Sequence, residues 1–476
     1  MDISKFLEIE KRYNLYNKSI EGISYWNYSR VQIWNYEICA QKLELQVSHP
    51  MKRAKLGEQI ATVAQLIRNT LLRGKKGKQT DILFLAHERR TKVEEIYQCI
   101  YTEPLAEKFP NSLTLDMPYE YKHLKPESNL KRYYIDYILI AGNLYYQIHK
   151  FFKTKHYKAT LSQLQKQMKK PLKEMMDSYQ VMLSEKELYR VLHKKLLVVE
   201  RERKIYDKLL RKIQPKLIVE VVYYGMHGMM LNELAKAYGI PTIELQHGTM
   251  HKDHAAYQIY WDKIIPQLPD QIFLFSDFWK KQIRVPIADD NLLVMGFPYF
   301  EKNRKKYNDS SVVRNGKTIL FISQGTIGDR LSRLAIEIAD KLLPQGYRII
   351  YKLHPAEIST WESKYSYLKN TGIEVVDGKK QNIYDCFAES DIQVGVYSTA
   401  IYEGLGFGLR TFIYNIGHAD TLLELAKEGY AQIVNDSCEL IELLSEEGTV
   451  KKGDLFWRDN ALSTIIAELQ KATYPT

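Results

Sequence analysis

The sequence has few cysteines and no long apolar run. Its four cysteines lie far apart with no CxxC pair, which excludes a disulfide framework and predicts reduced residues in the core. No stretch approaches the roughly 18 uninterrupted apolar residues that a membrane-spanning helix needs. Residues 1–12 are charged, unlike the start of a signal peptide. We therefore expect a cytoplasmic protein.

Metal-ligand patterns and repeats are missing as well. The chain has no Asp-x-Asp triplet and no metal-ligating residues clustered in sequence, which predicts chemistry without a bound metal. It also has no internal sequence repeat and no low-complexity tract, so a solenoid or a disordered polar protein is not expected.

Size and charge narrow the class of protein. A chain of 476 residues exceeds what one hydrophobic core usually organises, so two domains are expected. Hydrophobic residues make up 45% and charged residues 26%, as in ordinary folded proteins. The net charge of +11 calls for an anionic partner: nucleic acid, anionic lipid or a phosphorylated substrate.

Short β-rich runs alternate with helical stretches in two blocks, which predicts two doubly wound, Rossmann-like α/β domains that face a cleft. We expect an interdomain linker at the polar residues 302–316, between a first domain at 79–301 and a second at 317–476. The predicted strands of the first domain are 81–86, 112–116, 137–141, 217–222, 242–246, 271–275 and 292–295. Those of the second are 318–323, 348–353, 374–376, 392–395 and 411–414, with a helix over 330–343.

Two segments depart from this alternation. Residues 1–78 predict a helical N-terminal extension, and residues 143–212 predict a Lys-rich helical insertion in the first domain. Within the extension, residues 51–78 form a basic amphipathic pattern suited to an anionic membrane surface. A solvated helix that packs its apolar stripe on the first domain is the alternative, and we favour it.

The segment 351–355 (YKLHP) runs from a strand directly into His354 and Pro355. Proline ends the strand and biases its neighbour away from helix, so the imidazole is held at the carboxyl end of the strand. There His354 can donate a hydrogen bond to a phosphate oxygen, and Lys352 adds positive charge. The alternative is a capping histidine in an ordinary turn.

A second candidate loop lies in residues 391–408 (DIQVGVYSTAIYEGLGFG). Ser398 and Thr399 follow a strand and cap the next helix, whose free backbone N–H groups form a site for an anion. Glu403, one turn along, can accept hydrogen bonds from ribose hydroxyls. Plain capping explains the two hydroxyls but not the carboxylate or the glycines.

A third loop, residues 323–329 (SQGTIGD), follows the first strand of the second domain. Gly325 allows close approach of the backbone to a ligand, and Thr326 adds another hydroxyl. Three phosphate-compatible loops at three strand ends of one domain predict a nucleotide site there.

In the first domain, residues 243–249 (IELQHGT) place His247 at a strand end. A histidine can take a proton near neutral pH, as activation of a sugar hydroxyl requires. A structural role for His247 is equally compatible with the sequence.

Other candidates in the first domain follow its strands. Glu88, after the first strand, is the second candidate base, and His227 is a candidate for contact with an acceptor. Arg89 and Arg90 either hold an acidic acceptor or are surface charges.

Taken in order, the motifs QHGT (246–249), KLHP (352–355) and YSTAIYEGLGFG (397–408) resemble those of GT-B-fold enzymes of bacterial capsule, lipopolysaccharide and teichoic acid synthesis. The resemblance covers most of residues 80–456. Nearest in character are the capsule polysaccharide biosynthesis proteins, which include Kdo and sialic acid transferases that use CMP-sugars, and the CDP-glycerol glycerophosphotransferases.

The resemblance implies roles for individual residues. In these families the histidine of the HP motif and the hydroxyl residues of the later motif bind the donor phosphate, which implies that role for His354, Ser398 and Thr399. The histidine of the HGT motif is implicated as the base in the glycerophosphotransferases and corresponds to His247. The Asp/Glu-Asp/Glu-Gly motif of bacterial sialyltransferases is absent from the first domain, which argues against that activity.

We therefore expect a glycosyltransferase that moves a sugar from a nucleotide-activated donor to a growing surface glycan, free or lipid-linked, without a cofactor or a metal. Helix dipoles, backbone amides, His354 and Lys352 would offset the charge of the leaving group. The donor nucleotide, CMP, UDP or another, stays open, as does a peripheral position on the inner face of the membrane.

Three alternatives remain. A CDP-polyol phosphotransferase shares the fold and the motifs, and a nucleotide-sugar epimerase shares the fold. A nucleic-acid-binding protein fits the net charge, but the basic residues lie in helical stretches without interleaved aromatic motifs, so we expect no nucleic acid among the partners.

Overall fold

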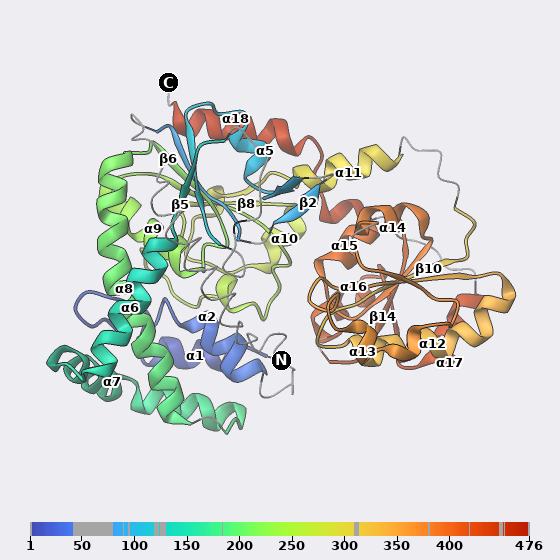
Figure 1. The fold of residues 1–476 in the computed structure, drawn as a ribbon, viewed down its shortest axis with the longest axis horizontal. Helices are drawn as coiled ribbons and strands as arrows, with labels where there is room; N and C mark the ends of the chain where they lie inside the picture. Colours follow the sequence, from blue (N-terminus) through green and yellow to red (C-terminus); the bar gives the residue numbers. More distant parts are fainter. Residues whose placement is uncertain are drawn as a thin grey trace.

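The computed structural model describes residues 2–40, 80–88, 90–93, 96–118, 123, 130–182, 184–308, 314–378, 381–417, 419–446, 451 and 453–474. The basic segment 51–78 and Arg89 lie outside these residues. The chain forms two α/β domains, each built on its own sheet (Figure 1).

The first sheet has seven parallel strands in the order β5-β4-β1-β6-β7-β8-β9. Their bounds are β1 (Ile82–Leu85), β4 (Ser112–Asp116), β5 (Arg132–Tyr134), β6 (Leu217–Val221), β7 (Thr242–Leu245), β8 (Gln271–Leu274) and β9 (Leu292–Val294). β1, β6 and β7 are buried along their whole length, as expected for parallel strands covered on both faces.

The second sheet has six parallel strands in the order β12-β11-β10-β13-β14-β15. They are β10 (Thr318–Ile322), β11 (Arg348–Lys352), β12 (Glu374–Val376), β13 (Ile392–Gly395), β14 (Arg410–Tyr414) and β15 (Gln432–Val434). The predicted doubly wound α/β fold is thus confirmed. In each sheet the strand order reverses beside the first strand, at β1/β6 and at β10/β13, where such sheets bind ligands.

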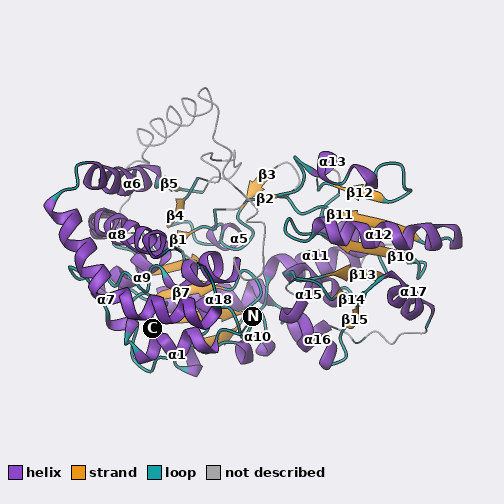
Figure 2. Cartoon of the chain, turned by 90° about the horizontal axis from the view of Figure 1, so that it is seen from below, coloured by secondary structure: helices purple, strands orange, loops and turns teal. Residues whose placement is uncertain are grey.

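Helices flank the strands of both domains (Figure 2). In the second domain they are α12 (Gly328–Leu342), α13 (Trp361–Lys364), α14 (Ile383–Glu389), α15 (Thr399–Gly406), α16 (Leu423–Lys427) and α17 (Ser437–Ser445). In α12, Leu331, Leu334, Ala335 and Ile338 recur at helical spacing and are all buried, so one apolar face fixes the helix against the sheet.

The helical insertion of the first domain consists of α6 (Asp136–Phe151), α7 (Lys155–Tyr179) and α8 (Glu185–Ile213). The strand predicted at 137–141 is wrong, because these residues belong to α6. Ile138, Gly142 and Tyr146 recur every four residues and are buried, a helical period that the β-branched run concealed. The strand at this place in the sheet is the short β5 just before the helix.

The N-terminal extension is anchored on the first domain. Its helices include α1 (Ser4–Arg12) and α2 (Arg30–Gln32), which continues as a π-helix over Ile33–Cys39. Arg30 and Glu10 form a buried ion pair at 2.6 Å, and Arg30 also donates to the carbonyl of Gln258 at 3.0 Å. The extension is therefore an integral part of this domain.

The junction between the domains is partly helical, where the sequence predicted a polar linker. α11 (Pro298–Asn308) extends into the segment predicted as a linker, 302–316. The last helix, α18 (Ala461–Thr473), returns to the first domain (Figure 1). Its Ile465 and Leu469 pack with Ile82 and Phe84 of β1, so the end of the chain covers one face of the first sheet.

Further elements of the first domain are α5 (Glu103–Ala106), α9 (Met226–Tyr238), α10 (Asp277–Gln282) and the hairpin of β2 (Thr91–Val93) and β3 (Ile96–Gln98). The sequence did not predict this hairpin. No helix among the described residues combines the length and apolar character needed to cross a bilayer.

Candidate functional site

The loop that carries His247 meets the second domain at the start of α15. A Cβ atom placed on Gly248 would lie 3.4 Å from Oγ1 of Thr399. The HGT loop after β7 and the hydroxyl loop after β13 thus approach each other from opposite domains. The structure brings together two of the predicted motifs that are far apart in the sequence.

Two of the predicted phosphate loops also touch within the second domain. The hydroxyls of Thr326, after β10, and Tyr397, after β13, share a short hydrogen bond. Ser398 accepts a hydrogen bond from the N–H of Ala400 at 3.2 Å, as predicted for a helix cap. Because β10 and β13 are neighbours at the reversal of strand order, Gly325, Thr326, Ser398 and Thr399 lie at one edge of the sheet.

Glu357 joins the His354 loop to the first of these loops. Its carboxylate accepts hydrogen bonds from the His354 N–H at 2.9 Å, the Ser323 hydroxyl at 3.0 Å and the Tyr365 hydroxyl at 2.9 Å. Glu357 is buried, and burial raises its pKa despite these donors. Sequence reasoning missed this residue, although an acidic residue three positions after His354 was a local signal for a loop-closing acceptor.

The space around this carboxylate requires a glycine. A Cβ on Gly328 would lie 2.1 Å from Oε1 of Glu357 and 2.3 Å from the hydroxyl oxygen of Tyr365, both impossible contacts. Gly328 is the first residue of α12, so the backbone of the 323–329 loop is packed directly on the group that fixes His354.

The other residues of the KLHP motif point in different directions. The Lys352 ammonium group lies beside Gly378, 3.0 Å from where a Cβ would be, and burial lowers its pKa. Pro355 is exposed. His354 is half-buried, and its Nδ1 accepts a hydrogen bond from the N–H of Ala356 at 3.2 Å. This contact turns Nδ1 toward the backbone of its own loop.

Glu403 is half-buried near the junction of the domains. Burial raises its pKa to about 7, and a hydrogen bond from Tyr384 partly offsets this effect. Burial, and after it the charge of Glu403, raises the pKa of Tyr299 on α11. A carboxyl group that titrates near neutral pH can either accept or donate a hydrogen bond, so its predicted contact with a ribose stays a prediction.

In the first domain, three loops meet at His247. Its Nε2 lies 3.3 Å from the hydroxyl of Tyr224, which follows β6. Its ring stacks on that of His87, which follows β1, with the two ring centres 5.8 Å apart. Tyr101 donates a hydrogen bond to its backbone carbonyl at 2.7 Å. His247 therefore lies at the reversal of strand order in the first sheet. Sequence reasoning named Glu88, which is exposed, but missed its neighbour His87.

His227 faces the helical insertion instead of the second domain. Its Nδ1 lies 3.0 Å from the hydroxyl of Tyr206 and 3.6 Å from Glu202, both on α8. Burial lowers the pKa of His227 to about 4, so the ring is neutral at pH 7.

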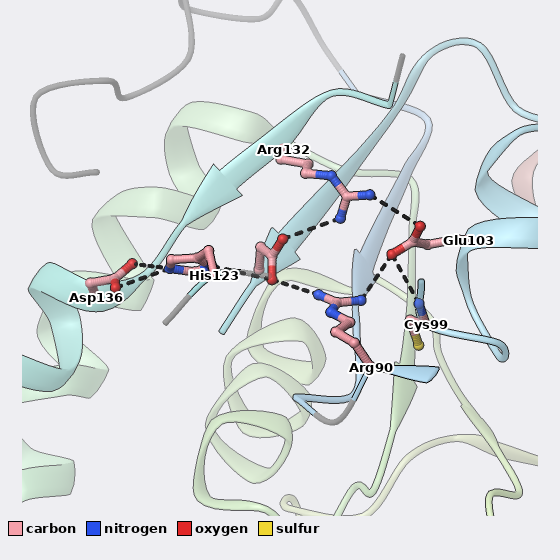
Figure 3. A network of polar contacts seen from close by, with 7 residues as sticks. Arg90, Cys99, Glu103, His123, Arg132 and Asp136 are labelled. Atoms are coloured by element: carbon pink, nitrogen blue, oxygen red, sulfur yellow. Dashed lines mark hydrogen bonds and ion pairs between the residues drawn. The ribbon is translucent and has the colours of Figure 1, made fainter. Parts of the chain in front are cut away.

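Arg90 is enclosed in a network of ion pairs (Figure 3). Its guanidinium contacts Glu103 at 2.9 Å and Asp116 at 2.5 Å, and Arg132 contacts both of these carboxylates at 3.1 Å. The side chain of Arg90 is only 6% exposed. Its charge is thus compensated inside the domain, and the predicted contact with an acceptor finds no support in this geometry.

One group of possible metal ligands does arise from the fold. Glu21, His156 and Glu200 have ligand atoms within 4.8 Å of one another, although they are far apart in the sequence. His156 already bonds Glu200 at 2.9 Å. The group lies in the helical insertion and extension, away from the strand ends described above.

Two Rossmann-like domains that meet at the carboxyl ends of their strands form the architecture of GT-B enzymes, as the motifs predicted. No family model and no curated protein matches the chain. Solved structures with a similar fold include the UDP-GlcNAc 2-epimerase from Methanocaldococcus jannaschii, at 12% identity and a TM-score of 0.46 over 82% of this chain and 98% of that chain.

The UDP-GlcNAc 2-epimerase from Neisseria meningitidis bound to UDP-GlcNAc has 12% identity and a TM-score of 0.46 over 82% of this chain and 99% of that one. The wall teichoic acid polymerase TagF has 12% identity and a TM-score of 0.45 over 88% of this chain and 98% of that one. Similarity this low says nothing about substrate or reaction, so we base the function proposed below on this chain's own residues.

Proposed function

We propose that the protein is a glycosyltransferase that transfers a sugar from a nucleotide-activated donor to an acceptor hydroxyl. The observation that carries this proposal is the approach of Gly248 to Thr399 across the two domains. It sets a candidate base, His247, opposite hydroxyls and backbone N–H groups suited to a phosphate.

The donor phosphates bind at the carboxyl edge of the second sheet. Thr326, Ser398 and Thr399 offer hydroxyls there, and the first turn of α15 offers free N–H groups. His354 contributes its imidazole from a loop whose backbone N–H donates a hydrogen bond to Glu357. These groups offset the charge that develops on the leaving nucleotide, so the proposed transfer needs no metal ion.

The acceptor side of the reaction belongs to the first domain. His247 takes the proton of the acceptor hydroxyl as its oxygen attacks the anomeric carbon, and the bond from that carbon to the nucleotide phosphate breaks. Tyr224 and His87 hold the imidazole from two sides. From the sequence motifs we propose a growing bacterial surface glycan as the acceptor, reached from the cytoplasmic face of the membrane.

A polyol-phosphate transferase is the second candidate. It is favoured by the identity of the group at the junction, since His247 lies beside the Gly248 that approaches Thr399, whereas the candidate carboxylate Glu88 is exposed. Mass analysis of the product separates the candidates: a sugar transferase adds a glycosyl unit, a polyol-phosphate transferase adds a phosphodiester, and an epimerase leaves the mass unchanged.

The test uses two histidine variants. We expect His354→Ala to weaken nucleotide binding about tenfold or more, because a hydrogen bond to a charged group is lost. We expect His247→Ala to abolish transfer with nucleotide binding unchanged. Thermal shift with CMP, CDP, UDP, GDP and TDP measures binding and names the donor class.

His149→Gln on α6 serves as the matched control, since its imidazole bonds only within the insertion, to Thr154. Wild-type nucleotide affinity and transfer rates in His354→Ala would overturn the proposed donor site. Undiminished transfer by His247→Ala would leave the donor site standing but remove the proposed base.

A further inference from the structure

A pocket lies in the helical insertion, apart from the loops described above. Its volume is about 480 Å³, within the range of small-molecule sites. It opens between α6 and α8, with the N-terminal extension and the start of α9 at its ends. The lining residues are Gln32, Asn143, Tyr146, Gln147, Lys150, Arg190, Val191, Lys194, Lys195, Val198 and Met226.

The pocket is strongly cationic. Lys150, Arg190, Lys194 and Lys195 line it, and no acidic side chain does among the residues that the structure describes. Within the described part of the chain, no ion pair joins any of the three lysines to a carboxylate, and Arg190 reaches only Glu187, at 3.9 Å. Like charges at positions i and i+4, such as 190 and 194, destabilise a helix, so a bound anion would relieve their repulsion.

Nearby acidic groups leave this charge largely uncompensated. Glu202 is fully buried beneath Lys195 on α8, and burial raises its pKa to about 8, so it is mostly protonated at neutral pH. Glu37 and Glu187 face Arg190 alone, and burial raises the pKa of Glu37. Burial also lowers the pKa of Lys195, so the positive charge of the pocket comes mainly from Lys150, Arg190 and Lys194.

Neutral donors complete the lining. The amides of Gln32, Asn143 and Gln147 lie on the same walls as the cations. Ammonium, guanidinium and amide N–H groups together match the several oxygen acceptors of a phosphate or diphosphate, and charge-assisted hydrogen bonds of this kind are the strong ones.

An apolar stripe of exposed side chains runs along α6, the helix that also lines the pocket. Leu144 is 55% exposed and Phe151 81% exposed, and the remaining members of the stripe are Ile140, Ile148 and Phe152. With 3.6 residues per turn, these positions flank the face of α6 that carries Asn143, Gln147 and Lys150. Exposed apolar side chains contiguous with a cationic pocket are typical of a surface that meets lipid.

We propose that this pocket binds the phosphate or diphosphate group of a membrane lipid, whose apolar part lies along the α6 stripe. The site does not depend on the donor loops, so it stands or falls separately from the proposed transferase activity. Pocket and stripe lie side by side on one helix, as the headgroup and the chain of a single ligand require.

The experiment compares two probes on the full-length protein. Vesicles of phosphatidylcholine with and without phosphatidic acid report binding of a lipid phosphate in a sedimentation assay, and inorganic pyrophosphate reports binding of a soluble anion by calorimetry. The pocket variant is Arg190→Gln/Lys194→Gln. Both side chains are exposed on α8, so we expect this variant to fold. The matched control is Lys166→Gln/Lys169→Gln, which removes the same charge from exposed positions on α7.

We expect the wild type and the control to bind the vesicles that contain phosphatidic acid, and the pocket variant to bind them about tenfold more weakly or worse. Leu144→Ser/Ile148→Ser should weaken vesicle binding but leave pyrophosphate binding intact. Calorimetry is repeated on His354→Ala protein, because the donor loops are themselves proposed to bind phosphates.

Equal vesicle binding by the pocket variant and its control would overturn the proposal. Binding of pyrophosphate in the pocket without any vesicle binding would overturn its lipid part, and so would a stable dimer that the Leu144→Ser/Ile148→Ser variant dissociates. None of these outcomes affects nucleotide binding at the donor loops, so a failure here is distinct from a failure of the transferase proposal.

Discussion

At the scale of single residues, Glu357 connects separate segments of the proposed donor site. One buried carboxylate accepts hydrogen bonds from His354, Ser323 and Tyr365, which belong to different segments of the second domain. Because His354 lies in a loop, its position depends on this acceptor more than on the strand before it. The histidine proposed to contact the donor is thus supported by a residue outside the proposed contact.

We expect Glu357→Ala to lower the free energy of unfolding by about 3 kcal/mol, because three buried donors lose their acceptor. The same variant should weaken nucleotide binding, since the His354 loop is released. Urea denaturation and thermal shift with nucleotide measure the two effects. Glu362→Ala, exposed on α13 and paired only with Lys369 at 3.2 Å, should change stability by no more than about 0.5 kcal/mol. An equal loss in both variants would contradict the role assigned to Glu357.

Motif reading located the residues that end strands but not the residues that support them. His247, His354, Thr326 and Ser398 were found because each follows a buried apolar run directly. Glu357 and His87 were not identified from the sequence, because their importance comes from contacts between loops that only the folded sheet brings together. For Arg90 the sequence offered an acceptor contact or a surface charge, and it gave no sign of the ion-pair partners, which lie 13 and 26 residues away.

At the scale of elements, apolar runs predicted nearly every strand of both sheets, because buried parallel strands leave no polar face in the sequence. Two strands, β5 and β15, were not predicted, and one predicted strand, 137–141, is wrong. Residues 137–141 have the composition of a strand, yet packing against α8 selects a helix, with Gly142 allowing close contact to Glu202. The pattern of five neighbouring residues does not reveal a packing partner some 60 positions away in the sequence.

Two neighbouring strands in the centre of the first sheet carry buried carboxyl groups side by side. Glu220 of β6 and Glu244 of β7 are register partners. Burial raises the pKa of each to about 8. Each group therefore binds a proton more tightly in the folded than in the unfolded state, which favours folding at low pH.

The stabilisation that these two bound protons provide is fully present below about pH 4.5, the pKa of the carboxyl groups in the unfolded chain. It is lost as the pH rises through about 8, their pKa in the folded protein. Between pH 6 and 9 we expect a loss of roughly 3 kcal/mol for each carboxyl group. Glu220→Gln should reduce the measured decline by roughly 3 kcal/mol, the share of one carboxyl group, as followed by urea denaturation at both pH values. Glu337→Gln, exposed on α12, should leave the decline unchanged. A wild-type protein equally stable at pH 6 and 9 would show that these carboxyl groups are ionised in the fold.

At the scale of the whole molecule, the chain crosses twice between the domains, and the second crossing could not be predicted. The order of elements assigned residues 461–473 to the second domain, but α18 caps its N-terminus with Glu301 of α11, whose carboxylate accepts from the N–H groups of Asn460 and Ala461 at 2.9 and 2.8 Å. Trp457 stacks on Phe300 of α11 at 4.1 Å. The two crossings are therefore packed on each other and set how the domains meet.

If the crossings fix the domains as described, the loops after β7 and β13 are close enough to be joined covalently. A Cβ at Gly248 would lie 3.4 Å from the side-chain oxygen of Thr399, a separation compatible with disulfide geometry. We expect the Gly248→Cys/Thr399→Cys protein to form this bond under mild oxidation, seen as the loss of two free thiols and a shifted band on a non-reducing gel. Each single variant provides the control, since the chain has an exposed native cysteine at Cys438. If both new thiols stayed reactive in the double variant, His247 would not lie opposite the phosphate loops, and the single reaction centre proposed here would be lost.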